Sequence, residues 1–214
     1  MSNLDFQRAY WDRVAWDKDF TISPDLAGVV ARLEPGARVL DYGCGYGRVA
    51  AELARLGCAG VVGVDASPEL IKRGLRENPG LDLRPMDELP LGFADGSFDA
   101  FLLIAVLTCI PGDQGQASLL NEIKRLLRPG GLLYIADFLI NDDARNKSRY
   151  EKYAGQFGAY GVFALEEGAV LRHHDPEYIV QLTHAFEQLS LGQAVTRTMN
   201  GHQSKAFRYL GRRA

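Results

Sequence analysis

Short apolar runs alternate with segments of helical period through the middle of the chain. The apolar runs that predict strands lie at residues 38–42, 60–65, 81–86, 98–107 and 132–138. The segments whose apolar residues fall on one helical face lie at residues 47–57, 67–78 and 113–128. The run at 98–107 has no polar alternation, which is typical of a strand covered on both faces. This pattern predicts a parallel sheet with helices on its faces.

The pattern changes after residue 140. Residues 141–159 are polar and predict an irregular segment, and residues 160–174 read as two short strands around an acidic, glycine-containing turn. Helical period returns at 175–186, with Asp175 as N-cap. Two final strands at 188–198 and 204–212 predict an antiparallel pair. We expect the inserted hairpin to lie over the functional edge of the sheet as part of a lid.

Composition places the chain among ordinary globular proteins. With 214 residues and 47% apolar residues, one domain is expected, and a net charge of −3 gives no general attraction to nucleic acid or anionic lipid. The longest apolar run is too short to cross a bilayer, and the N-terminus lacks the apolar core of a secretory signal. Three cysteines without a CxxC pair predict neither a disulfide scaffold nor a metal site, and they favour a reducing cytoplasm.

Three glycines at alternate positions, Gly43, Gly45 and Gly47, follow the first apolar run. Such spacing lets a ligand approach the backbone closely. A dinucleotide fingerprint needs glycine at its sixth position, where this chain has Arg48, so a nicotinamide or flavin cofactor is disfavoured. A carboxylate, Asp41, precedes the glycines, and a second, Asp65, ends the next strand.

Five segments carry a family resemblance in order and spacing. They are LDYGCGYG, VVGVDAS, MDELPL, GSFDAFLLIAVL and LLRPGGLLYIADF. Together they resemble the motifs of class I, seven-stranded methyltransferases that use S-adenosyl-L-methionine, of the bacterial small-molecule type, over about residues 30–214. The resemblance implies a doubly wound α/β fold with a mostly parallel seven-stranded sheet and an antiparallel last strand. It divides a single domain 1–214 into an N-terminal helical cover (1–27), a cofactor-binding half (28–140), a hairpin lid insertion (141–173) and a C-terminal helix with strands (174–214).

The same resemblance implies the residues that hold S-adenosyl-L-methionine and its product S-adenosyl-L-homocysteine. They are Asp41, Gly43, Cys44, Gly45, Gly47, Asp65, Ala66, Met86, Asp87, Glu88, Ile104 and Ala105. Asp41 would organise the glycine loop and attract the ammonium of the cofactor, and Asp65 would accept both ribose hydroxyls. Met86 would pack on the adenine, with Asp87 or else Glu88 accepting from its amine.

The absence of one motif near the end of the strand at 98–107 restricts the class of methyl acceptor. The sequence there, IAVLTCIP, lacks the polar-Pro-Pro-aromatic tetrapeptide that holds a nucleobase amine, so DNA is disfavoured and a small molecule is expected. Whether oxygen, nitrogen, sulfur or carbon accepts the methyl group stays open. If a general base is used, the candidates are His174, Asp137 and Tyr150. Because neighbours on a strand face opposite sides, at most one of His173 and His174 can face the cleft, and we prefer His174.

Several alternatives stay open at this level. Tyr10, Trp11 or Trp16 could supply an aromatic cover over the site. The chain could be a catalytically silent cofactor-binding module or, less favoured, a nicotinamide-dependent dehydrogenase. A basic C-terminal cluster, made of Lys205, Arg208, Arg212 and Arg213, is more typical of a solvated face but also fits an RNA methyltransferase. A homodimer is an alternative to the monomer.

Overall fold

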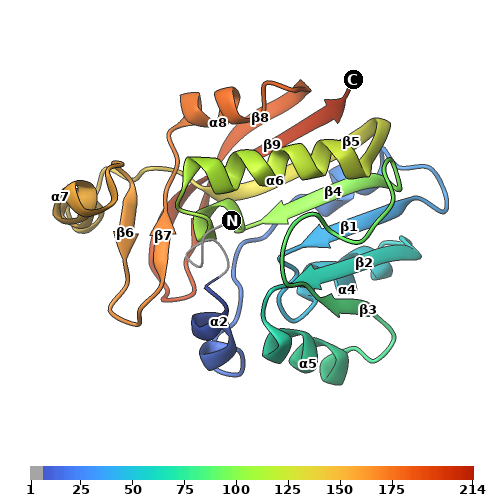
Figure 1. Ribbon diagram of the computed structural model, residues 1–214, viewed down its shortest axis with the longest axis horizontal. Coiled ribbons are helices and arrows are strands. Elements are labelled where there is room, and N and C mark those ends of the chain that lie inside the picture. The colour runs from blue at the N-terminus through green and yellow to red at the C-terminus, as the bar shows by residue number, and fades with distance from the viewer. Residues whose placement is uncertain (1–6) are drawn as a thin grey trace.

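The computed structural model describes residues 7–214, which form one large sheet and one small hairpin (Figure 1). The strands are β1 (Arg38–Tyr42), β2 (Gly60–Asp65), β3 (Asp82–Pro85), β4 (Phe98–Ile104), β5 (Leu127–Phe138), β6 (Val162–Ala164), β7 (Val170–Arg172), β8 (Phe186–Arg197) and β9 (Gln203–Arg213). The helices are α2 (Arg8–Val14), α3 (Leu26–Val30), α4 (Arg48–Arg55), α5 (Pro68–Glu77), α6 (Asp113–Leu126), α7 (Ala144–Phe157) and α8 (Pro176–Leu182), with a 3-10 turn, η1 (Leu107–Cys109).

The large sheet has seven strands in the order β3-β2-β1-β4-β5-β9-β8. β1 pairs in parallel with both β2 and β4, and β9 pairs antiparallel with both β5 and β8. The predicted doubly wound fold with an antiparallel last strand is therefore confirmed. Because the strand order reverses between β1 and β4, a crevice opens at their carboxyl ends, where open α/β sheets bind ligands.

Successive residues of each central strand enter different layers of the core. Val39 packs with α3 and α4 on one face of the sheet, whereas Leu40 packs with α6 and α8 on the other. Figure 1 shows α6 crossing the near face of the sheet. Apolar residues at consecutive positions are therefore buried on both sides, which explains the unbroken apolar runs in the sequence.

Two helix starts follow the local sequence as expected. The Ser67 hydroxyl accepts a hydrogen bond from the Leu70 N–H at 3.1 Å at the start of α5. The Asp175 carboxylate accepts from the Glu177 N–H at 2.8 Å at the start of α8. A proline occupies the first helical turn in both cases, where its missing N–H costs no hydrogen bond.

The expectation of an irregular segment at 141–159 is wrong. A helix of 14 residues, α7, begins where Asp143 accepts from the Asn146 N–H at 3.1 Å and ends at Gly158, whose φ is +68°. Only Asn146 and Tyr150 of this helix are fully buried, so the apolar stripe that Tyr150 forms with the half-buried Tyr153, Ala154 and Phe157 is a weak signal in the sequence. The hairpin that follows is confirmed, since β6 and β7 pair antiparallel with Phe163 opposite Leu171.

The N-terminal cover connects the sheet to this hairpin. The Gln7 side chain accepts from the Val170 N–H and donates to the Val170 carbonyl, both at 2.7 Å, and it also donates to the Cys109 carbonyl. On the other side, the Asp12 carboxylate accepts from the Ser67 hydroxyl at 2.5 Å. Arg73 of α5 donates to the carbonyls of Ala15 and Lys18. The cover is thus fixed to both the cofactor half and the lid.

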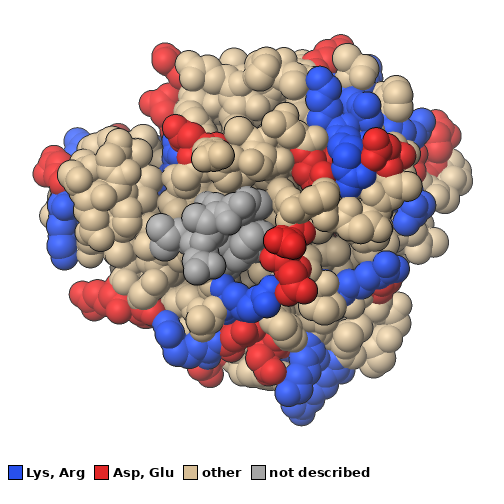
Figure 2. Space-filling view, viewed as in Figure 1, with Lys and Arg blue, Asp and Glu red and all other residues tan. Residues whose placement is uncertain are grey.

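The surface mixes charges of both signs. Figure 2 shows Lys and Arg side chains beside Asp and Glu side chains over the face drawn there. Arg8 and Asp87, for example, form an ion pair at 2.7 Å. Within residues 7–214, no helix combines the length and the apolar character that spanning a bilayer requires.

Candidate active site

The loop after β1 is shaped by glycines in the left-handed region. Gly43, Gly45 and Gly47 have φ of +68°, +56° and +76°. A Cβ at Gly43 would lie 2.7 Å from Cγ2 of Val106, and one at Gly45 would lie 2.0 Å from Cε2 of Phe20. Both positions therefore exclude larger residues by backbone conformation and by space.

Asp65, at the end of β2, holds this loop. Its Oδ2 accepts from the Gly45 N–H at 2.8 Å, and its Oδ1 accepts from the Ser67 N–H at 2.8 Å. Each oxygen keeps further acceptor capacity, because a carboxylate offers about four lone-pair sites. Burial raises the pKa of Asp65 to about 6, although these two backbone N–H groups lower it. Asp65 lines a cavity at the carboxyl ends of β1, β2 and β4.

Asp41 faces the same cavity from β1. It is only 1% exposed, and its Oδ2 forms no hydrogen bond with any described residue. Burial, together with the nearby Asp65 carboxylate, raises the pKa of Asp41 to about 7, although the Arg48 guanidinium lowers it. A buried oxygen without a partner is costly, so Asp41 is prepared to receive a donor or a cation from a ligand.

The end of β3 and the end of β4 form the walls on either side. Met86, Ile104 and Ala105 all line the cavity, with Ala66 and Cys44 beside them. Ala105 has φ of +57°, a conformation that few residues other than glycine adopt, and its N–H donates to the Ala136 carbonyl at 2.8 Å. The predicted wall residues are therefore brought together around one cavity.

Four predicted cofactor residues do not line the cavity. Gly45 lies beneath the Phe20 ring, and Gly47 is the N-cap of α4. The Asp87 side chain is 87% exposed and accepts from Arg8 of the cover, and Glu88 is exposed beside it. Arg8 also donates to the Met86 carbonyl at 3.1 Å, which fixes the backbone at the edge of the cavity.

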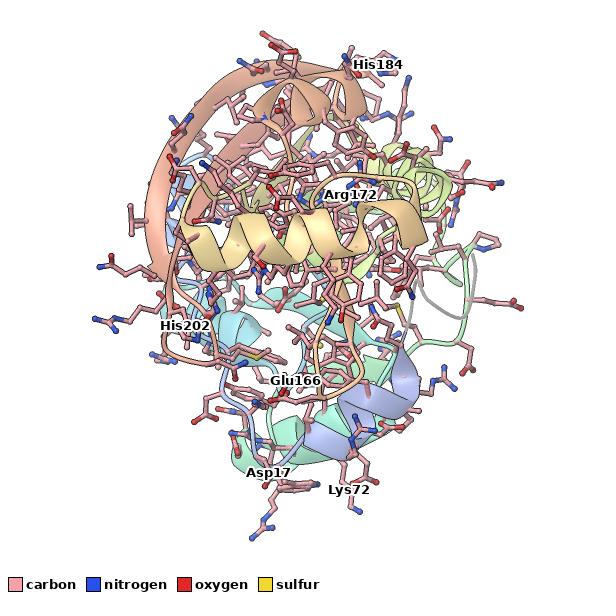
Figure 3. The ribbon with its side chains drawn as sticks, turned by 90° about the vertical axis from the view of Figure 1, so that its left-hand side faces the viewer. Asp17, Lys72, Glu166, Arg172, His184 and His202 are labelled. Carbon is pink, nitrogen blue, oxygen red and sulfur yellow. The ribbon has the colours of Figure 1, made fainter. Side chains whose placement is uncertain are left out.

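The cavity extends beyond the glycine loop into a second half formed by later parts of the chain. This half, called the lid half below, is lined by Phe138, Arg145, Arg149, Phe163, Leu165, Leu171, His173, Thr198, Met199, Asn200 and His202. Figure 3 shows the β6–β7 turn, marked by Glu166, and the β8–β9 turn, marked by His202, both between α7 and the N-terminal segment of Asp17. Two hairpin turns and a helix therefore close over one side of the site.

The N-terminal aromatics separate into different roles. Trp11 lines the cavity, as does Phe20, which had drawn no attention in the sequence. Tyr10 is buried and donates to the Glu167 carboxylate at 3.1 Å, whereas Trp16 is 45% exposed. Trp11 is therefore the one of the three candidates that covers the site.

The expectation that His174 faces the cleft is wrong, because His173 lines the cavity and His174 does not. His174 is 1% exposed, and its Nε2 lies 2.9 Å from Nε2 of Gln116 behind the site. Burial lowers the pKa of His174 to about 3. The two histidines face opposite sides, as expected, but the backbone after β7 turns His173 rather than His174 toward the cavity.

His173 meets the chemical requirements of a base more closely. Its Nδ1 lies 2.6 Å from the Tyr150 hydroxyl, and its ring stacks on Phe138 with centroids 5.4 Å apart. No described residue forms a hydrogen bond with its Nε2. Burial holds the pKa of His173 well below its usual value, and the positive charges of Arg149 and Arg145 lower it further. The ring is therefore neutral, and when Nδ1 carries the ring proton its Nε2 is free to accept a hydrogen bond, although the lowered pKa makes it a weaker proton acceptor than a free imidazole.

Asp137 and Tyr150 also lie behind the cavity rather than in its lining. Asp137 is fully buried, and its carboxylate accepts from the Thr108 N–H at 3.1 Å and the Phe138 N–H at 2.7 Å. It thereby fixes the loop after β4 that includes Ala105. Burial raises the pKa of Asp137 to about 7. In this arrangement Asp137 positions the cavity wall, and Tyr150 positions His173.

Sequence reasoning missed Arg145, Arg149 and the turn at 198–202. The two arginines are four residues apart, which would have placed them on one face if α7 had been recognised as a helix. The turn carries no local signal for the cavity, because only the pairing of β8 with β9 brings it there. Among residues 7–214, no group of three His, Cys, Asp or Glu side chains could hold a metal ion.

Comparison with known proteins matches this geometry. Residues 40–135 match a methyltransferase domain family. A crystal structure of an S-adenosylmethionine-dependent methyltransferase from Methanosarcina mazei superposes with a TM-score of 0.80 and 25% identity, over 86% of this chain and 96% of that one. Residues 40–135 thus match a methyltransferase domain, and the fold around them is that of a solved S-adenosylmethionine-dependent methyltransferase.

Among curated proteins, the chain is similar to enzymes of quinone biosynthesis. It is 37% identical over 134 residues to a ubiquinone biosynthesis O-methyltransferase of Xanthomonas oryzae, which covers 56% of this chain and 54% of the relative. It is 41% identical over 105 residues to a demethylmenaquinone methyltransferase of Beutenbergia cavernae, covering 49% of this chain and 42% of the relative. The chain spans about half the length of these relatives.

Proposed function

We propose that the protein is a methyltransferase that transfers the methyl group of S-adenosyl-L-methionine to a small-molecule acceptor. The observation that carries the proposal is the pair of buried carboxylates at the ends of β1 and β2, one with a free oxygen, beside glycines whose space a side chain would fill. This donor set suits a nucleoside joined to a positively charged amino acid.

Each residue has a role in holding the cofactor. Asp65 would accept the ribose hydroxyls with the lone pairs that Gly45 and Ser67 leave free, and Asp41 would attract the ammonium. Met86 would pack on the adenine opposite Ile104, and Asp87, which pairs with Arg8 outside the cavity lining, would accept from the adenine amine. The bound cofactor supplies a methyl group already made electrophilic by its sulfonium.

The remaining chemistry is orientation and, for a protonated nucleophile, removal of a proton. Phe138, Phe163 and Leu171 orient the acceptor, and such positioning can supply roughly 7 to 11 kcal/mol of the barrier. His173 Nε2 accepts the proton where the nucleophile is a hydroxyl or an ammonium, and Tyr150 fixes the ring. We propose His173 for this role in place of His174.

The relatives that methylate quinone precursors support an acceptor with an apolar body. Two members of the basic C-terminal cluster are paired with carboxylates, Lys205 with Asp142 at 3.0 Å and Arg212 with Glu187 at 3.5 Å, which disfavours RNA as the substrate. Arg208 and Arg213 donate to the carbonyls of Ser23 and Leu127. A homodimer and a cytoplasmic location remain predictions.

Isothermal titration with S-adenosyl-L-homocysteine tests the proposal. We expect binding by the wild type and a loss of roughly tenfold to a hundredfold in affinity for Asp65→Asn, which removes a charged acceptor. Asp82→Asn is the matched control, because Asp82 lies on the neighbouring strand and pairs only with Arg84 at the surface. No binding by the folded wild type, or binding of reduced nicotinamide dinucleotide instead, would refute the proposal.

A further inference from the structure

Two guanidinium groups of α7 face the lid half of the cavity. Arg145 and Arg149 are four residues apart, so both project from one face of the helix, and both line the cavity. Arg149 is half-buried, and Arg145 is more exposed. No part of the cofactor scheme described above uses either residue.

Neither arginine has a carboxylate within ion-pair distance in the described protein, although the Asp143 charge acts on both and Arg149 shares a hydrogen bond with the Tyr150 hydroxyl. The Nε of Arg149 is buried without a hydrogen bond to any of residues 7–214. The carboxylate of Asp143 on the same helix is occupied in capping α7 through Asn146. A partly buried guanidinium without an anion is costly, because the charge loses hydration without gaining a partner.

The surroundings hold Arg149 in place. Its guanidinium carbon lies 3.6 Å from the centroid of the Phe163 ring, a stacked arrangement that fixes the plane of the group. Burial lowers the pKa of Arg149, and its charge, together with that of Arg145, also lowers the pKa of His173. The two positive charges therefore act on the same space as the proposed base.

The two ends of the cavity carry different sets of charges: the sheet end has two carboxylates with Arg48 beside Asp41, whereas the charged residues of the lid half are arginines. Asp41 and Asp65 are the only carboxylates among the described residues that line it, and both come from the sheet. Arg145 and Arg149 come from the inserted helix that packs on β6. One end thus suits the cationic part of the cofactor, and the other suits an anion.

We infer that the methyl acceptor is an organic acid whose carboxylate is bound by Arg149 and Arg145, with its apolar body against Phe163, Leu165 and Leu171. This inference rests on the proposed function and narrows its substrate class. A planar guanidinium matches a carboxylate through two parallel hydrogen bonds, which lysine could not reproduce. The acid would hold the acceptor in one orientation relative to His173.

The test uses three aromatic acids, benzoate, phenylacetate and cinnamate, each paired with its neutral primary amide. Binding is titrated by ligand-observed NMR, with and without S-adenosyl-L-homocysteine. We expect at least one acid to bind the wild type roughly tenfold or more tightly than its amide, since a charged hydrogen bond is replaced by a neutral one. Arg149→Met, which keeps an apolar chain against Phe163, is expected to abolish this preference, and Arg145→Met to reduce it.

Lys147→Met is the matched control, because Lys147 lies on the same helix but is exposed and does not line the cavity. Equal binding of acids and amides, or a preference unchanged in Arg149→Met, would overturn the inference. It would also be overturned if Arg149→Met lowered the affinity for S-adenosyl-L-homocysteine by tenfold, because the arginines would then bind the carboxylate of the cofactor. Failure of the wild type to bind S-adenosyl-L-homocysteine would refute the proposed function instead. The preference for acids over amides, measured without S-adenosyl-L-homocysteine, would still test whether the two arginines bind a carboxylate.

Discussion

The Tyr150 hydroxyl lies 2.6 Å from Nδ1 of His173, and both groups are almost fully buried. The same hydroxyl accepts from the Asn141 N–H at 3.3 Å. Tyr150 therefore connects α7 to the residue that ends the lid hairpin on its cavity side. A contact between two lid elements thus sets the direction in which Nε2 of His173 points.

Removing that hydroxyl should destabilise the protein. Tyr150→Phe leaves the Asn141 N–H without its partner and leaves Nδ1 of His173 with only the longer contact to the Asn141 side-chain amide at 3.4 Å, and we expect a loss of about 1 to 3 kcal/mol in the free energy of unfolding. Urea denaturation measures this loss. Tyr153→Phe on the same helix is the control, with an expected change below about 0.5 kcal/mol. Equal losses in the two variants would show that the Tyr150–His173 contact contributes nothing.

The contact between Phe20 and Gly45 should appear as an energetic coupling. Gly45→Ala places a Cβ 2.0 Å from Phe20, whereas Gly158→Ala has a similar φ, +68°, with nothing within 4 Å. Both substitutions carry the left-handed penalty of about 1 to 2 kcal/mol, and we expect Gly45→Ala to cost clearly more.

A double-mutant cycle with Phe20→Ala isolates the steric part of this cost. In thermal or urea unfolding, Phe20→Ala should be less destabilising in the Gly45→Ala background than in the wild type, with a coupling of roughly 0.5 to 3 kcal/mol. Additive effects would mean that the N-terminal cover does not press on the glycine loop in solution.

Cofactor affinity should depend on pH through Asp41. Because burial raises the pKa of Asp41 to about 7, the group is partly protonated near neutrality, whereas the cationic cofactor favours its ionised form. The dissociation constant for S-adenosyl-L-methionine should therefore fall as pH rises from about 6 to about 8, by up to roughly tenfold per pH unit below the pKa. Calorimetric titration across this range should give a flatter dependence for Asp41→Asn, and an identical slope would contradict the role of Asp41.

The contribution of Asp137 to folding stability should fall as pH rises, whereas the cofactor affinity that depends on Asp41 should rise. The pKa of Asp137 is raised from 3.8 to about 7 in the folded protein, so the folded state binds more protons than the unfolded state between these values. Its contribution is present below about pH 4 and is lost as pH rises through about 7. We expect the melting temperature of Asp137→Asn to depend less on pH over this interval than that of the wild type.

Asp82→Asn controls for a general effect of removing a carboxylate. The Arg84 hydrogen bond lowers the pKa of Asp82, so its contribution is present above the usual value and is lost only in acid. Differential scanning calorimetry of the three proteins at several pH values separates the two behaviours. If Asp137→Asn and Asp82→Asn changed the pH dependence of the melting temperature in the same direction between about pH 4 and pH 7, the raised pKa of Asp137 in the folded protein would be contradicted.

Much of the cofactor half could be predicted from the sequence because its signals are local. The unbroken apolar runs of β1 and β4 reflect burial on both faces, and the position of Asp41 and Asp65 at strand ends follows from chain order alone. Parallel strands bring their carboxyl ends to one edge, so residues at these ends had to lie close together. The Ser67 cap depends only on neighbouring residues, whereas the space at Gly43 and Gly45 is also limited by Val106 and Phe20, which are distant in the chain.

The lid half was decided by tertiary structure. Which of His173 and His174 faces inward depends on how the segment after β7 meets the residue that follows β5, where His174 bridges Leu139, and a shift of one residue would exchange them. The helix that carries Arg145 and Arg149 has a weak apolar stripe, because Tyr150 is its only fully buried apolar residue and Tyr153, Ala154 and Phe157 are half-buried. The turn with His202 reaches the cavity only through the long β8–β9 pairing. Local sequence determines periodicity, but these side chains meet through contacts between segments distant in the chain.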